Sequence, residues 1–178
     1  ECGQEDKLAE KKREGLGRNL GSAIHEKADA VEAVLDSHPE VDFVQLQVNY
    51  ADWESETVES RKCYEAARAR NLPVVVMEPV KGGSLVKLPD DAAAVLRNAA
   101  PDEPLAAWAL RFAASLPGVL TVLSGMSTPA QVEENVRTMR AFRPVRPAER
   151  PAPHHLRPLL GRIPPVPGPA LRSLPKAC

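Results

Sequence analysis

Ser124–Ser127 is a short loop of mostly small residues that leads into the expected start of a helix. Thr128 stands at the N-cap position, Pro129 at the first helical position and Gln131 three residues past the cap, which is the capping-box pattern. Backbone N–H groups at a helix start have no partners within the helix, so they attract anions, phosphate above all. Many strand–loop–helix connections bind nothing, so a phosphate site and an ordinary connection both remain open.

A second polar group alternates with apolar residues along the expected strand at 41–50. One face carries valine and leucine, and the other carries Gln45, Gln47 and Asn49. A strand buried between helix layers is normally apolar on both faces. Buried amides without partners cost about 1–3 kcal/mol each. The strand is therefore either a solvent-facing antiparallel strand or one wall of a polar pocket, and the flanking helical segments favour the pocket.

These residues need a framework, and the sequence predicts strands and helices in regular alternation. Strands are expected at 19–24, 41–50, 73–77 and 119–123. Helices are expected at 6–14, 26–38, 54–70, 90–98 and 102–116, and a last one begins at Pro129. Such alternation indicates a parallel sheet, either open and doubly wound or part of a barrel. No GxGxxG follows a strand, and Glu78 and Ser124–Ser127 follow strand ends, where a (β/α)₈ barrel places its chemistry.

Composition narrows the classes of function. The chain has 178 residues and a formal net charge of −1, which argues for one domain and against a nucleic-acid binder. No apolar run is long enough to span a membrane. Cys2, Cys63 and Cys178 are odd in number and far apart, which suits a reducing compartment, so we expect a cytoplasmic protein without a disulfide framework or metal site. Because the chain starts at Glu1, we expect a processed protein or a piece of a longer one.

The composition changes at Arg143, where prolines become frequent and acids almost disappear. Proline at this density prevents regular helices and ladders, so residues 143–178 are expected to form an extended, disordered tail after a domain at 1–142. A polyproline segment that binds a partner stays open as an alternative.

Four motifs in order resemble the C-terminal half of an aldo/keto reductase: VDFVQLQVNY (41–50), VVVMEPVKGG (74–83), WALRF (108–112) and VLSGMSTPAQVEEN (122–135). Members of that family are (β/α)₈ barrels that transfer hydride from a nicotinamide cofactor, usually NADPH, to an aldehyde or ketone. The motifs MEPVKGG and LSGMS are similar to those of the bacterial branch of the family that carries a ferredoxin-like iron–sulfur module.

The resemblance implies a cofactor site. Gln45 would hold the nicotinamide carboxamide, and Met77, followed by Glu78 and Pro79, stands where many members stack an aromatic ring on the nicotinamide. The phosphates would be bound by the loop and the helix start, at Ser124, Gly125, Met126, Ser127 and Gln131. Glu134 and Asn135 would contact the adenine. Gln131 replaces an arginine that NADPH-selective members often have, so the cofactor is NADP(H) or NAD(H).

The departures from the family pattern concern the chemistry. The catalytic Asp, Tyr, Lys and His belong to the first half of the barrel, upstream of Glu1, so no residue here is assigned as catalytic. We interpret His25 as a pocket-wall or structural residue. Where the iron–sulfur branch has CxxCxxC, this tail has Gly168, Leu171 and Leu174 with only Cys178 left, so no cluster is expected. A reading-frame slip in GC-rich DNA would produce such a tail.

The sequence thus predicts an α/β chain forming the C-terminal half of a (β/α)₈ TIM barrel, with about four βα units. Its function would be that of a fragment of an NAD(P)H-dependent reductase, without the catalytic residues and inactive alone. Its partners would be the cofactor and a small carbonyl substrate, not nucleic acid or membrane. The alternatives are a non-catalytic half-barrel that binds nucleotide or self-associates through exposed edges, and a gene fragment that cannot fold.

Overall fold

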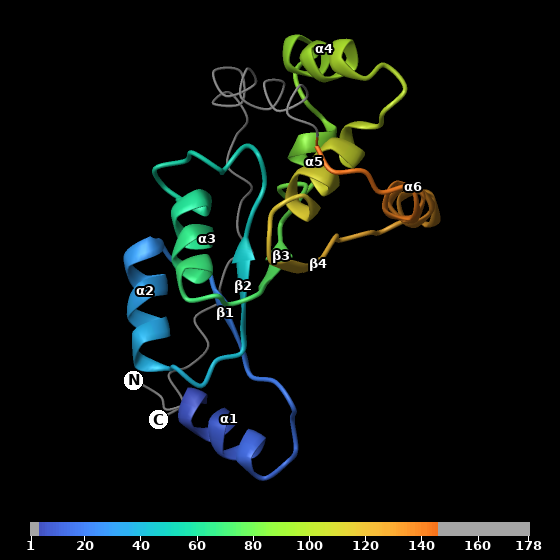
Figure 1. Ribbon diagram of the computed structural model, residues 1–178. Coiled ribbons are helices and arrows are strands. Elements are labelled where there is room, and N and C mark those ends of the chain that lie inside the picture. Colours follow the sequence, from blue (N-terminus) through green and yellow to red (C-terminus); the bar gives the residue numbers. More distant parts are fainter. Residues whose placement is uncertain (1–3, 146–178) are drawn as a thin grey trace, which may run out of the picture.

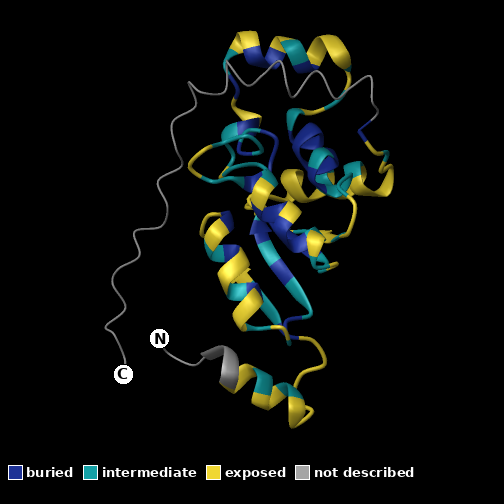
Figure 2. Cartoon of the chain, turned by 60° about the vertical axis from the view of Figure 1, so that its left-hand side comes forward, coloured by how far each residue is buried: buried dark blue, intermediate teal, exposed yellow. Residues whose placement is uncertain are grey.

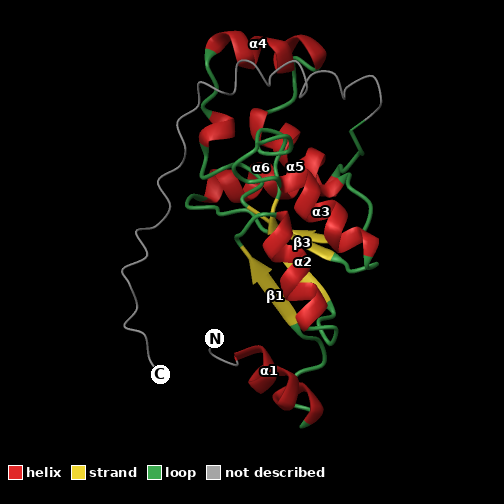
Figure 3. Ribbon diagram, turned by 90° about the vertical axis from the view of Figure 1, so that its left-hand side faces the viewer, coloured by secondary structure: helices red, strands yellow, loops and turns green. Residues whose placement is uncertain are grey.

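The computed structural model describes residues 4–145, and its centre is a four-stranded parallel sheet. The strands are β1 (Gly21–Ile24), β2 (Phe43–Gln47), β3 (Val74–Met77) and β4 (Val119–Val122). Their spatial order is β1-β2-β3-β4, and all neighbouring pairs are parallel. Figure 3 shows the strands in yellow, grouped in the middle of the molecule. The four expected strands are confirmed, with shorter bounds, and all their carboxyl ends lie at one edge of the sheet.

Helices separate the strands as the alternation predicts. They are α1 (Gln4–Arg13), α2 (Ala28–Ser37), α3 (Ser60–Ala69), α4 (Asp90–Ala99), α5 (Leu105–Ala114) and α6 (Pro129–Arg140), with the 3₁₀ helix η1 (Ser84–Val86) after β3. Figure 1 shows α2 and α3 side by side along one side of the sheet, with α1 and α4 at opposite ends of the molecule. Each crossover from one strand to the next contains at least one helix, as parallel strands require.

The helix expected at 54–70 begins only at Ser60, so its predicted start is wrong. Side chains bond the backbone before that point instead: Asn49 Oδ1 accepts from the N–H of Ala51 and Asp52 at 3.1 and 2.9 Å. Such local bonds compete with helix formation. Glu59 then has φ 55°, a left-handed conformation that no helix continues through.

Two hydrophobic clusters hold the helices to the sheet. In the first, Val44 and Leu46 of β2 and Val74 and Val76 of β3 are at most 1% exposed and pack with residues of α2 and α3. The second joins Tyr50 to buried residues of η1, α4 and α5, among them Leu85, Leu96 and Trp108. In Figure 2 the interior of the sheet is dark blue and teal, whereas the outer helix faces are yellow.

The structure tests one of the two interpretations of the alternation along β2. β2 is parallel to both β1 and β3, so the antiparallel alternative is wrong. Val44 and Leu46 face the helices, while Gln45 and Gln47 are half-buried on the opposite face. That face, opposite α2 and α3, places amide groups next to the strand ends.

The described chain ends in a segment that is anchored to α5. Arg111 is 1% exposed, and its guanidinium donates to the carbonyls of Arg143 (2.9 Å) and Pro144 (3.3 Å) and pairs with Glu103 (3.2 Å). The N–H of Val145 donates to Ser115 Oγ at 2.8 Å, and Val145 is buried. The expected disorder of the proline-rich tail from 146 to 178 lies outside the described residues.

Candidate functional site

The residues predicted for the site lie on three neighbouring strands and on the loops that follow them. Gln45 is on β2, Met77 ends β3, and Ser124–Ser127 follow β4. Because β2, β3 and β4 are adjacent and parallel, the loops after them emerge together at the carboxyl edge of the sheet. The structure therefore brings the candidates from three separate motifs of the sequence to one end of the fold.

Gln45 and Met77 are in direct contact. Gln45 Nε2 donates to Met77 Sδ at 3.4 Å. Met77 is 8% exposed and is the register partner of Gln47, so both glutamines lie beside Met77 on the face opposite α2 and α3. The contact leaves the carbonyl end of the Gln45 amide directed away from the sulfur.

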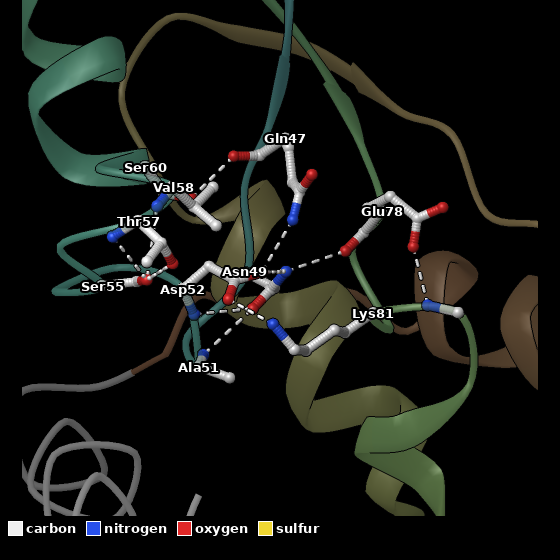
Figure 4. A network of polar contacts seen from close by, with 11 residues as sticks. Gln47, Asn49, Ala51, Asp52, Ser55, Thr57, Val58, Ser60, Glu78 and Lys81 are labelled. Carbon is white, nitrogen blue, oxygen red and sulfur yellow. Dashed lines mark hydrogen bonds and ion pairs between the residues drawn. The ribbon is translucent and has the colours of Figure 1, made fainter. Parts of the chain in front are cut away.

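A buried polar cluster ties the end of β2 to the loop after β3 (Figure 4). Asp52, 3% exposed, accepts from Gln47 Nε2 at 2.8 Å and from Asn49 Nδ2 at 2.9 Å through the same oxygen. Its other oxygen forms an ion pair with Lys81. The amides that looked costly to bury therefore have partners, and the buried carboxylate has a cation that balances its charge.

The loop after β3 is shaped by Glu78 and Pro79. The carbonyl of Glu78 accepts from Asn49 Nδ2 at 3.1 Å, and its carboxylate accepts from the N–H of Gly82 at 2.6 Å. Glu78 and Lys81 have φ of 55° and 50°, a left-handed conformation uncommon outside glycine. Pro79 is buried. These contacts place the backbone just past Met77 in one conformation.

Asp52 and Lys81 were not among the predicted site residues. A signal for Asp52 was present, since it lies three residues after Asn49 at a strand end, the spacing of a turn closed by side chains. Nothing in the sequence pairs Lys81 with it, because the two are 29 residues apart.

The capping box at the start of α6 is confirmed. Gln131 N donates to Thr128 Oγ1 at 3.3 Å, and Gln131 Oε1 accepts from the N–H of Ser127 and Thr128 at 2.7 and 3.1 Å. The side-chain oxygen of Gln131 is thus already engaged. In the described part of the chain, the backbone N–H groups of Gly125, Met126 and Ala130 remain without a partner and are available to an anion.

Asn135 links α6 to the loop that precedes it. Its Nδ2 donates to Ser124 Oγ at 2.9 Å, and both Asn135 and its neighbour Glu134 are half-buried. The contact holds the two ends of the candidate phosphate and adenine region together. A built Cβ at Gly125 would meet nothing within 4 Å, so the loop is open at that point.

Neither tyrosine is placed as a proton donor. Tyr50 is 6% exposed, its hydroxyl has no partner among the described residues, and burial raises its pKa. The Tyr64 hydroxyl donates to the carbonyl of Pro117 at 2.6 Å, and burial raises its pKa too. His25, directly after β1, is exposed. Over residues 4–145 there is no group of three or more metal-ligating side chains.

Comparison with known proteins identifies the family. The model of the aldo/keto reductase family matches residues 3–145. The chain belongs to the aldo/keto reductase family. Among solved structures, it is similar to the aldo-keto reductase AKR11C1 from Bacillus halodurans in its holo form, with 24% identity, a TM-score of 0.66, and coverage of 83% of this chain and 53% of that one. None of the curated proteins matches it.

A second similar structure is the aldo-keto reductase from Klebsiella pneumoniae in complex with NADPH, with 16% identity, a TM-score of 0.65, and coverage of 92% of this chain and 56% of that one. The chain thus spans about half the length of the structures it matches. The predicted fold is confirmed: the parallel strands and their helices form part of the (β/α) barrel of aldo/keto reductases, so the doubly wound alternative is wrong. The described residues include no helix with the length and apolarity needed to cross a membrane.

Proposed function

We propose that this chain is the cofactor-binding half of an NAD(P)H-dependent aldo/keto reductase whose proton-transferring Asp, Tyr, Lys and His lie outside the sequence. The observation that carries the proposal is the contact between Gln45 and Met77 on the face opposite α2 and α3, with the open loop at Ser124–Ser127 after the neighbouring strand β4. The site would bind a nicotinamide cofactor, and the complete enzyme would act on a small aldehyde or ketone.

The residues present fit such a cofactor. Met77 gives the nicotinamide ring a soft contact surface, with Glu78 and Pro79 holding the backbone next to it. The unpartnered N–H groups of Gly125, Met126 and Ala130, at the positive end of the α6 dipole, suit the phosphates. Glu134 and Asn135 lie about two helical turns further on, where the adenine would be. When bound, the cofactor supplies the hydride.

Both NADP(H) and NAD(H) remain in the proposal because of Gln131. Its amide oxygen closes the capping box, and a neutral amide cannot form the bidentate charged contact that arginine makes with a 2′-phosphate. The phosphate at the 2′ position would therefore add little to affinity. We include no iron–sulfur cluster, and a reducing, cytoplasmic compartment follows from the three scattered cysteines.

The test is a fluorescence titration of NADPH and NADH with the purified chain and with Gly125→Asp. The aspartate would place a carboxylate against the phosphates, and we expect a loss of at least about 2 kcal/mol, roughly thirtyfold in affinity. The space around Gly125 and its ordinary φ mean that the substitution should leave the melting temperature unchanged. Ala141→Asp, at the far end of α6, adds the same charge away from the loop and should bind like the wild type.

Equal affinities for wild type and Gly125→Asp would reduce the loop to a connection. Absence of binding by the wild type itself would refute the cofactor site in this chain.

A second candidate function is favoured by the exposed apolar edge of the sheet. β4 has a neighbour on one side only, Leu120 and Leu123 are 63% and 45% exposed, and α6 buries none of its residues. Unpaired strand edges and apolar patches promote association. We propose that the isolated chain self-associates through β4 and α6, as a non-catalytic half-barrel would.

A further inference from the structure

Gln47 has a hydrogen-bonding orientation that its surroundings determine. Its Nε2 lies 2.8 Å from Asp52 Oδ2. An ionised carboxylate only accepts hydrogen bonds, so the NH₂ end of the amide must face Asp52, and the flipped amide is excluded. The side-chain oxygen of Gln47, Oε1, therefore points away from Asp52, as Figure 4 shows.

Asp52 is itself held in place by two other side chains. Asn49 donates to the same oxygen at 2.9 Å, and Lys81 forms an ion pair with the other. Asn49 cannot flip either, because its Oδ1 accepts from the backbone N–H of Ala51 and Asp52. Both Asn49 and Asp52 are at least 97% buried, where such networks are strong and rigid.

The two glutamines of β2 present the same group next to Met77 of β3. Gln45 uses its Nε2 on the sulfur of Met77, as Gln47 uses its Nε2 on Asp52. In the described part of the chain, neither side-chain oxygen Oε1 has a hydrogen-bond partner. The face opposite α2 and α3 therefore offers two acceptors beside the residue that would contact the nicotinamide ring, and Asp52 fixes that of Gln47.

We propose that Gln47 is a second binding residue for the nicotinamide end of the cofactor, accepting through Oε1 from the carboxamide NH₂, and that Asp52 is its positioning residue. The inference rests on the proposed cofactor function. A carboxamide NH₂ has two hydrogens, which matches two acceptors on the strand next to one thioether. Lys81 takes part by holding the loop after β3 to Asp52.

The experiment compares Gln47→Met with the wild type in the full chain. The probes are NADP⁺ and its 3-acetylpyridine analogue, which has a methyl ketone in place of the carboxamide and so has no NH₂ to donate. Calorimetric titration gives the ratio of their affinities for each protein. We expect Gln47→Met to lower the preference for NADP⁺ by roughly threefold to tenfold, the effect of one net hydrogen bond. Thr121→Val, a near-isosteric change on exposed β4, should leave the ratio unchanged.

Asp52→Asn tests the positioning role. An asparagine can turn its oxygen toward Lys81 and its NH₂ toward Gln47, and Gln47 would then reverse and present a donor. Asn49 would lose its bond to residue 52 but keep its bond to the Glu78 carbonyl. Asp52→Asn should therefore lower the ratio in the wild-type background but not in the Gln47→Met background. A purely structural effect would weaken both probes equally in both backgrounds and would overturn the positioning role.

The outcomes separate this inference from the function on which it rests. If the wild type binds NADP⁺ and Gln47→Met leaves the ratio unchanged, the second acceptor is refuted and the cofactor site stands. If the wild type binds neither probe, the proposed function and this inference are both refuted. Gln47 is only half-buried, so Gln47→Met should fold even if Asp52→Asn does not. The ratio of affinities measured with Gln47→Met then decides whether Gln47 is a binding residue.

Discussion

Single residues decide what chemistry this chain can perform. Hydride transfer to a carbonyl leaves an alkoxide that needs a proton, and general acid catalysis contributes about 10²–10⁴-fold. Tyr50 and Tyr64 are the only tyrosines, and burial raises the pKa of each, which makes them weaker acids. We predict that the purified chain, with NADPH or NADH, reduces no member of a panel of aldehydes and quinones. Cofactor oxidation that depends on substrate and scales with protein concentration would contradict this prediction.

Cys63 allows a second prediction at the same scale. It is 4% exposed, its Sγ lies 3.6 Å from the carbonyl of Glu26, and burial raises the pKa of its thiol. Thiolate is the reactive form, so a buried, protonated thiol reacts slowly. In a Cys2→Ser/Cys178→Ser variant, Ellman's reagent should modify Cys63 at least about tenfold more slowly than in the same protein in urea. Equal rates would mean that the packing between α2 and α3 opens readily.

Among the elements, the strand–helix alternation was predictable, but several bounds were not. The apolar residues of β2 and β3 that predicted these strands are buried in the structure, so local sequence contains that information, whereas no residue of β4 is buried. The late start of α3 depends on side-chain bonds from Asn49 and on the left-handed Glu59, and charged residues at 54–59 give no sign of either.

In the candidate site, too, some contacts follow from local sequence and others depend on the fold. The capping box is a local motif, and its expected bonds are all present. The contact between Gln45 and Met77 depends on the register of two strands, which the sequence does not specify. Lys81 could be paired with Asp52 only after the fold had brought the loops together. The cofactor role of these residues stays a proposal.

Asp42 connects two elements, and its contribution should depend on pH. It accepts from Lys12 of α1 and, at 2.6 Å, from the N–H of Leu20, contacts that lower its pKa. The stabilisation is present above the unfolded-state pKa of about 3.9 and is lost as pH falls through the lower folded-state pKa. Asp42→Asn should cost about 0.5–1 kcal/mol at pH 7 and much less near pH 3, as measured by urea unfolding.

Asp36→Asn is the matched control for that measurement. Asp36 forms an ion pair with Arg70 at a side-chain exposure of 69%, whereas that of Asp42 is 37%. Exposed pairs contribute little, so this variant should lose less than half as much at pH 7. An identical loss for Asp42→Asn at pH 3 and pH 7 would show that the carboxylate charge plays no part.

At the scale of the whole molecule, the open edge predicts association. We expect light scattering of the chain at micromolar concentration to report dimers or larger species. Leu120→Lys, on β4, should shift the distribution toward monomer. Leu16→Lys makes the same change at a residue of similar exposure, 74% against 63%, after α1, and should leave it unchanged. A stable wild-type monomer would exclude self-association.

The buried guanidinium of Arg111 has a practical consequence for anyone who shortens this chain. Composition suggests a cut before Arg143, yet the carbonyls of Arg143 and Pro144 are acceptors for a side chain that water hardly reaches. A polypeptide that ends at Phe142 would leave the Arg111 N–H groups that bond these two carbonyls without acceptors inside the protein. One that ends just after Val145 would keep both bonds, together with the bond from Val145 N to Ser115 Oγ. The smallest fragment to express therefore includes residues 143–145, which composition alone would assign to the tail.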